Sequence, residues 1–267
     1  MKIYLMTDLE GVAGVIDFEQ WCLSHSRYYD LAKKLLTSEV NAAVDGFFAG
    51  GADEIIVADG HGSGGIDITL LDSRVELMRG WPDLWPLNLN DSYDGLAFVG
   101  QHAKAGTEFA HLPHTQNLYH IDVSINGVSI GEFGQLAMCA SELGIRTFFG
   151  SGDLAFTKEA HGLIPGIETV SVKYGLTRGS GDELPEKDYW TRNTAAIHKV
   201  PSVACSMIRT GAEKAMRRYK TEDFGIINLK PPYELVVKYR ASDESPASTH
   251  VYNDDSSISA LLNKYLS

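Results

Sequence analysis

The fold is decided by a short apolar run that breaks into acidic residues, KIYLMTDLEG at residues 2–11. Its first part, Lys2 to Met6, is typical of a short buried strand. Asp8 and Glu10 follow directly and are separated by one residue, so their carboxylates share a side. The stretch therefore predicts a strand that carries two acidic side chains at its carboxyl end.

The same arrangement recurs twice further along the chain. The apolar residues 54–58 lead to His61, which stands between two glycines, and residues 96–99 lead to His102. In open α/β sheets, ligands bind in the crevice outside the carboxyl ends of the strands. We therefore expect three strand ends to place metal-binding side chains at one edge of a sheet. Residues 146–149 before Gly150-Ser151-Gly152-Asp153 predict a fourth strand end.

The segments between these strands predict their connections. Residues 28–48 have apolar side chains at helical spacing and end at Gly50-Gly51, a strong helix stop. A strand, a helix and a second strand form a βαβ unit, which implies parallel strands. Asn126-Gly127, between two short strands at 120–125 and 128–130, favours a tight hairpin.

The later part of the chain changes character. A helix is predicted over 133–143, and residues 176–188 are polar and rich in glycine, which indicates a surface loop. The tail predicts a helix, two strands and a closing helix at 203–219, 233–239, 249–252 and 258–266. We therefore predict an α/β fold with a mainly parallel sheet flanked by helices in residues 1–198, and a smaller α+β domain in residues 199–267.

The composition limits the function classes. With 267 residues, 44% of them hydrophobic, the chain can bury a substantial core. Its net charge of -12 repels phosphate backbones and anionic lipids, so neither a nucleic acid nor a membrane is an expected partner. The longest apolar runs are far short of the roughly 20 residues that span a bilayer. The three cysteines are far apart and fit reduced thiols, so we expect a cytoplasmic protein.

Five residues with carboxylate or imidazole side chains stand at the predicted strand ends and loops: Asp8, Glu10, His61, His102 and Glu132. Taken singly, each has an ordinary structural role, such as a turn cap, a hydrogen-bonded histidine or an acidic residue at a helix N-terminus. As a set, they match the ligands that zinc, manganese and cobalt accept.

Five ligands are too many for one catalytic ion that must keep an open position. They suit two ions bridged by one carboxylate, which polarise a scissile carbonyl or phosphoryl group and activate water. Such a site also needs a group that moves protons or stabilises an oxyanion. His111 and His114 follow His102 closely and are the candidates for that role.

These residues resemble the M55 family of metallopeptidases, and the resemblance covers most of the chain. It is carried by five segments in the same order and spacing: Thr7 to Gly11, Asp59 to His61, Gly100 to Gly106, His114-Thr115, and Asn126 to Glu132. The chain departs from the family pattern where a serine is replaced by Gly60 and where Pro113 precedes the histidine.

The resemblance implies two zinc ions per subunit, with Mn²⁺ or Co²⁺ as alternatives. It implies that Asp8 bridges the ions, that Glu10 and His61 bind one of them, and that His102 and Glu132 bind the other.

It also implies that His114 is the catalytic histidine. The expected activity is that of a metallo-aminopeptidase, a hydrolase that removes N-terminal residues, D-amino acids above all, from short peptides or aminoacyl amides by metal-activated water. The expected assembly is a ring-shaped homodecamer with active sites facing an internal channel.

Two alternatives stay open at the level of sequence. Asp8-Leu9-Glu10-Gly11-Val12 resembles the signature of haloacid-dehalogenase-type phosphatases, which use an aspartate nucleophile and magnesium. That reading leaves the two histidines and Glu132 without a role, and it needs an acidic pair after a late strand, whereas Asp254-Asp255 lies just before the final helix. The second alternative is a non-catalytic module that binds a metal or a small ligand in the same crevice.

Overall fold

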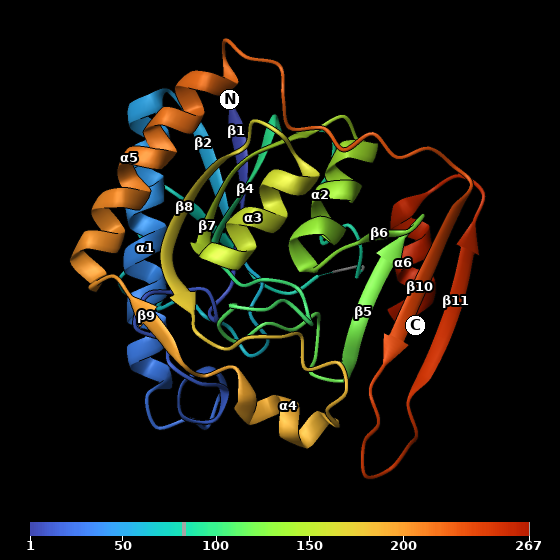
Figure 1. Cartoon of the computed structure of the whole chain (residues 1–267). Helices are drawn as coiled ribbons and strands as arrows, with labels where there is room; N and C mark the ends of the chain where they lie inside the picture. Colours follow the sequence, from blue (N-terminus) through green and yellow to red (C-terminus); the bar gives the residue numbers. More distant parts are fainter. Residues whose placement is uncertain (82–83, 267) are drawn as a thin grey trace.

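The computed structural model describes residues 1–81 and 84–266, and its main feature is a sheet of seven strands in the order β3-β2-β1-β4-β7-β8-β9 (Figure 1). All neighbouring strands are parallel except β9, which is antiparallel to β8. The strands are β1 (Lys2–Thr7), β2 (Glu54–Asp59), β3 (Glu76–Met78), β4 (Gly95–Gln101), β7 (Arg146–Asp153), β8 (Glu168–Gly175) and β9 (Ala196–His198).

The sheet has one apolar core on each face. Strand β1 lies between β2 and β4. Its side chains point alternately to the two faces, so Ile3 and Leu5 are buried in one core and Tyr4 and Met6 in the other. A parallel strand that is buried on both faces reads as a continuous apolar run, which is why the first residues of the chain predicted it correctly.

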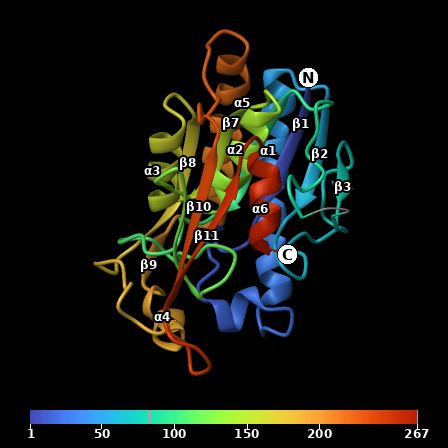
Figure 2. The same ribbon diagram turned by 90° about the vertical axis from the view of Figure 1, so that its right-hand side faces the viewer.

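Helices cover both faces of this sheet (Figures 1 and 2). On one face, α1 (Tyr29–Gly50) packs along α5 (Pro201–Tyr219), and the close approach requires glycine: a Cβ at Gly46 would lie 2.3 Å from the carbonyl oxygen of Arg209. On the other face lie α2 (Glu132–Glu142) and α3 (Leu154–Leu163). The predicted end of the first long helix is confirmed, because Gly51 caps α1 with a φ of 96°.

A smaller antiparallel sheet stands beside the main one, in the order β11-β10-β5-β6. Its strands are β5 (His120–Ile125), β6 (Val128–Ser129), β10 (Tyr233–Tyr239) and β11 (Ser248–Asp254), and α6 (Ile258–Leu266) packs between this sheet and α2. The predicted hairpin is confirmed, since Asn126 and Gly127 both have a positive φ.

The predicted fold class is confirmed: a mainly parallel sheet flanked by helices, with a smaller antiparallel sheet. The division into residues 1–198 and 199–267 stays a prediction, and elements from both ranges interleave. β5 pairs with β10, and α5 packs on α1.

Several elements differ from the prediction. The strand expected to end at Phe149 runs on to Asp153, because its glycines let it approach β4 closely; a Cβ at Gly152 would lie 1.8 Å from the carbonyl oxygen of Gln101. The predicted loop over 176–188 ends at a helix, and α2 begins one residue early, at Glu132. Elements that were not predicted are the π-helical turn η1 (Phe18–Cys22), β3, α3, β8, α4 (Glu186–Arg192) and β9.

Over the described residues, no helix is both long enough and apolar enough to cross a membrane.

Candidate metal centre

The candidate ligands gather where the strand order of the main sheet reverses. From β1 the chain proceeds to β2 and β3 on one side, then returns to place β4 on the other. Asp8, His61 and His102 follow β1, β2 and β4 within two residues, and Glu132 is the first residue of α2. The crevice at such a reversal is the usual binding site of open α/β sheets. The structure thus brings together all five residues named from the sequence.

Asp8, Glu10 and His61 form the first cluster, in which the ligand atoms all lie within 4.8 Å of one another. The Nε2 atom of His61 lies 2.8 Å from the carbonyl oxygen of Cys22, so it donates there, and Nδ1 keeps its lone pair. That Nδ1 atom faces Oδ1 of Asp8 at 3.2 Å and Oε2 of Glu10 at 3.1 Å.

His102 and Glu132 form the second cluster together with Asp8. The Nδ1 atom of His102 donates to the carbonyl oxygen of Ala103 at 2.9 Å, which leaves the lone pair of Nε2 pointing inward. This Nε2 atom lies 3.1 Å from Oδ2 of Asp8 and 3.5 Å from Oε1 of Glu132. The two oxygens of Asp8 therefore face different clusters.

The charges in the site favour a bound cation. Burial lowers the pKa of His61 and of His102, but the neighbouring carboxylates outweigh this effect and raise both pKa values well above the ordinary range. Burial likewise raises the pKa of Asp8, yet the two imidazoles hold it well below its usual value. Lone pairs of nitrogen and oxygen that face each other at such distances require a proton or a metal ion between them.

The donor set fits zinc. Oδ2 of Asp8, Oε2 of Glu10 and Nε2 of His102 are buried and have no hydrogen-bond partner among the described residues, 1–81 and 84–266. Around a tetrahedral zinc ion with bonds of about 2.0–2.2 Å, neighbouring donor atoms stand roughly 3.3–3.6 Å apart. The four nitrogen–oxygen separations in the two clusters, from 3.1 to 3.5 Å, are close to that spacing. Each histidine is also oriented by a backbone carbonyl, as is usual for metal-binding imidazoles.

His114 stands beside the second cluster, and its ligand atom lies within 4.8 Å of those of His102 and Glu132. Its ring stacks on His102 with the centroids 3.8 Å apart, and its Nδ1 atom donates to the carbonyl oxygen of Leu112 at 3.0 Å. Its Nε2 atom lies 3.8 Å from Oε1 of Glu132. Burial, together with the neighbouring His102, lowers the pKa of His114, so the imidazole is neutral at neutral pH and Nε2 can accept a proton.

His111, the other histidine considered from the sequence, lies outside the centre. It is fully buried, and its Nε2 atom donates to the carbonyl oxygen of Ile16 at 2.9 Å. Burial, with Lys173 and His198 nearby, lowers the pKa of His111 to about 2. It therefore supports the loop after β1 and does not line the cavity at the centre.

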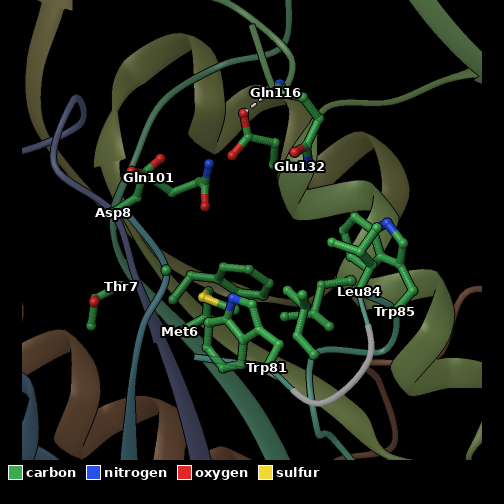
Figure 3. Close-up of a pocket in the computed structure, with 13 residues that line it drawn as sticks. Met6, Thr7, Asp8, Trp81, Leu84, Trp85, Gln101, Gln116 and Glu132 are labelled. Atoms are coloured by element: carbon green, nitrogen blue, oxygen red, sulfur yellow. Dashed lines mark hydrogen bonds between the residues drawn. The ribbon is translucent and has the colours of Figure 1, made fainter. Parts of the chain in front are cut away.

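Two cavities meet at the centre. One, of about 260 Å³, is polar and lined by Asp8, Glu10, His61, His114 and Glu132, among others. The second, of about 160 Å³, is largely apolar and is shown in Figure 3. In that view Asp8 and Gln101 lie on one side of the opening, and Gln116 and Glu132 lie on another.

Two buried ionisable residues, which the sequence did not single out, hold the loop that carries Asp8 and Glu10. The Nζ atom of Lys173 donates to the carbonyl oxygens of Glu10 at 2.5 Å and of Val15 at 3.3 Å. Glu39 of α1 accepts from the backbone N–H of Ala13 at 2.9 Å.

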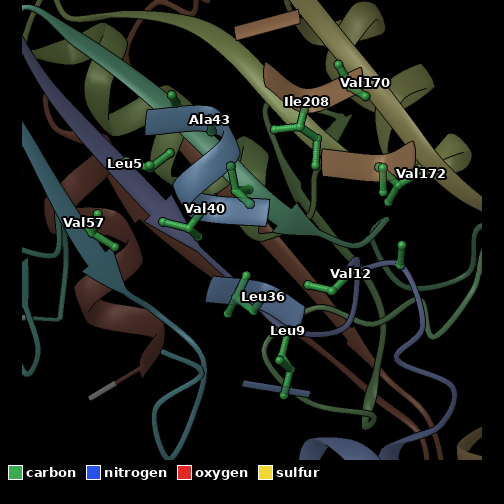
Figure 4. Packing of buried hydrophobic residues seen from close by; sticks show 14 of the residues in the cluster. Leu5, Leu9, Val12, Leu36, Val40, Ala43, Val57, Val170, Val172 and Ile208 are labelled. Atoms are coloured by element: carbon green, nitrogen blue, oxygen red, sulfur yellow. The ribbon is translucent and has the colours of Figure 1, made fainter. Parts of the chain in front are cut away.

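Apolar side chains fix the same loop. Leu9 and Val12, on either side of Glu10, are buried against α1 in the core around Leu36 (Figure 4).

One sequence signal could have revealed the role of Glu39. This residue lies on the apolar face of α1, between Leu36 and Val40.

Glu39→Gln should change how stability depends on pH. Burial raises the pKa of Glu39 from 4.5 to about 8, so the folded protein holds a proton there that the unfolded chain releases. The free energy of unfolding of the wild type should therefore fall relative to Glu39→Gln as the pH rises from about 5 to about 8, by at most about 1.4 kcal/mol per pH unit. Urea unfolding of both proteins at several pH values measures the difference. Parallel curves across that range would contradict the assignment.

The chain is similar to known proteins in both sequence and fold. The model of the peptidase family M55, described as D-aminopeptidase, matches residues 1–252. A D-aminopeptidase from Bacillus subtilis strain 168 is 29% identical over 185 residues, which are 67% of this chain and 66% of that relative. A solved structure, the Zn-dependent D-aminopeptidase DppA from Bacillus subtilis, described as a self-compartmentalizing protease, has a TM-score of 0.84 and 20% identity, and the match covers 100% of this chain and 96% of the other. This last likeness concerns the fold.

Proposed function

Because the chain belongs to the M55 family of D-aminopeptidases, as its sequence motifs predicted, we propose that it is a dinuclear zinc-dependent aminopeptidase. It removes N-terminal residues, D-amino acids above all, from short peptides or aminoacyl amides. Zinc is the proposed metal, and the same oxygen and nitrogen donors also accept Mn²⁺ or Co²⁺.

The observation that carries this proposal is the position of Asp8. Its Oδ1 atom faces His61 and its Oδ2 atom faces His102, so a single carboxylate joins two donor clusters. Glu10 completes the first cluster and Glu132 the second. Two ions joined by a carboxylate are the arrangement of two-metal hydrolases.

The residues around the clusters have distinct roles in the proposed reaction. When bound, the two ions polarise the scissile carbonyl and lower the pKa of water. His114 is neutral, stands beside the second cluster and accepts or returns a proton at Nε2. Its Nδ1–H bond to Leu112 and its stacking on His102 hold the ring in that orientation.

The phosphatase alternative gains no support. Asp254 ends β11 in the smaller sheet, where it pairs with Lys264 at 2.7 Å. The first residue of the acidic pair that a haloacid-dehalogenase-type site needs thus ends a strand of a different sheet from Asp8, and Asp255 follows that strand. The buried histidines that face Asp8 have no role in that mechanism.

The proposal is tested by hydrolysis of matched D- and L-aminoacyl amides and short peptides by the zinc-loaded protein, with the chelated protein as control. We expect release of the N-terminal residue, a preference for the D-series, and loss of activity after chelation. Absence of hydrolysis with two ions bound would overturn the enzyme and leave a metal-binding module. Faster hydrolysis of the L-series would overturn the stereochemistry alone.

The assembly gives a further prediction. We propose that the protein forms a closed homo-oligomer, a decamer, because its family resemblance implies one and a self-compartmentalizing protease shares its fold. Light scattering at working concentration should report a mass near ten times the 29.2 kDa of the chain. A stable monomer would contradict this assembly. The cytoplasmic location stays a prediction.

A further inference from the structure

The second cavity at the centre has one polar side and one apolar side (Figure 3). Its polar side is formed by Asp8, Gln101, Gln116 and Glu132. Its apolar side is formed chiefly by two indole rings and four further apolar side chains: Met6, Trp81, Leu84, Trp85, Phe98 and Leu136. A pocket that is mainly apolar, with a few polar groups at one end, is typical of small-molecule sites.

This cavity opens directly onto the candidate metal centre. Asp8, Gly60, Gln116 and Glu132 line both the apolar cavity and the polar one. A molecule that is held at the two donor clusters can therefore place a neighbouring apolar group in the second cavity without leaving the first.

The floor of the cavity is formed by buried side chains of the main sheet and of α2. Met6 comes from β1, Phe98 from β4 and Leu136 from α2, and these three side chains are 7%, 1% and 1% exposed.

The cavity volume is about 160 Å³. An apolar cavity of about 150 Å³ holds a benzene molecule. There is thus room for one large apolar side chain.

Gln101 gives an independent sign that the polar side of the cavity receives a ligand. The residue is 2% exposed, lines the cavity, and its side-chain nitrogen has no hydrogen-bond partner within the part of the chain that the structure describes. A buried amide donor without a partner costs free energy unless a ligand supplies an acceptor.

We propose that this apolar cavity is the specificity pocket for the side chain of the N-terminal residue, and that it selects apolar side chains of leucine to phenylalanine size. The inference rests on the proposed function, because it takes the scissile bond to lie at the donor clusters. It adds the substrate class: peptides or amides that begin with a large apolar residue.

The first test is a substrate panel with the zinc-loaded protein. Glycine, alanine, leucine and phenylalanine amides of both stereochemical series are compared, and the second residue is varied separately in dipeptides. We expect kcat/KM to rise tenfold or more from alanine to leucine or phenylalanine at the first position, with little change at the second. Equal kcat/KM across the first position would overturn the proposal.

Truncation of the pocket provides the second test. Leu84→Ala should lower kcat/KM for leucine and phenylalanine amides by about tenfold and change that for alanine amide less than about twofold. Leu70→Ala is the matched control, since Leu70 is 49% exposed, close to the 47% of Leu84, and does not line the cavity. Trp81→Ala should repeat the pattern of Leu84→Ala. An equal loss on all substrates would contradict the pocket.

A binding measurement separates failure of the pocket from failure of the proposed function. Tryptophan fluorescence of the zinc-loaded protein is titrated with phenylalaninol and alaninol, which carry no scissile bond. We expect phenylalaninol to bind tenfold or more tightly, and Leu84→Ala to remove most of that difference. If no amide is hydrolysed but this preference holds, the aminopeptidase is overturned and the apolar pocket stands. Equal Kd values would overturn the pocket.

Discussion

Asp8→Ala is expected to release both metal ions and to abolish hydrolysis. The reason is the geometry of one carboxylate, whose Oδ1 atom lies 3.2 Å from Nδ1 of His61 and whose Oδ2 atom lies 3.1 Å from Nε2 of His102. Loss of activity should exceed the roughly 10²–10³-fold cost of removing a single oxyanion donor. Metal content by elemental analysis and turnover on one aminoacyl amide measure the two effects.

Glu10→Ala and Glu132→Ala are the matched controls for this experiment. Each carboxylate belongs to only one cluster, Glu10 with His61 and Glu132 with His102. Each variant should therefore lose or weaken one ion and keep the other. Retention of both ions by Asp8→Ala, or loss of both ions by each control, would contradict a bridging role that belongs to Asp8 alone.

His114→Ala is expected to keep both ions and the fold, but to lose roughly a hundredfold or more in kcat. Its imidazole is neutral because burial and the neighbouring His102 lower its pKa, and its Nε2 atom faces Glu132 at 3.8 Å. Metal content, thermal stability and turnover of the same preparation separate a catalytic role from a structural one.

His111→Ala serves as the comparison for His114→Ala. His111 donates to the carbonyl oxygen of Ile16, away from the cavities, so its loss should lower the melting temperature and reduce kcat much less. A variant of His114 that loses one ion would make this residue a ligand. Near-normal kcat in His114→Ala beside an inactive, metal-loaded and folded His111→Ala would assign catalysis to the other histidine.

The candidate ligands could be predicted from the sequence because each follows a local signal. A buried parallel strand reads as an apolar run, and the residues after it lie at the edge where ligands bind. The ends of β1, β2 and β4 each carry this signal, and Asn126-Gly127 identifies the hairpin in the same way. Their convergence follows from the parallel order of three neighbouring strands.

The parts that the sequence did not predict depend on contacts between distant segments. The support of Glu10 by Lys173 joins residues 163 positions apart. The apolar cavity takes Trp81 from one loop and Leu136 from α2. The pairing of β10 with β5 joins the two halves of the smaller sheet across more than 100 residues. No local sequence pattern predicts these long-range contacts, because they follow only from the packing of the whole chain.

The most direct test of the two-metal centre is a crystal structure of the zinc-loaded protein with anomalous diffraction recorded at the zinc edge. The arrangement of the donor clusters predicts two anomalous peaks, about 3.5–4 Å apart, with one on each side of the Asp8 carboxylate. One peak should lie beside Glu10 and His61, and the other beside His102 and Glu132. A single peak, or two peaks that do not share Asp8, would contradict the dinuclear centre.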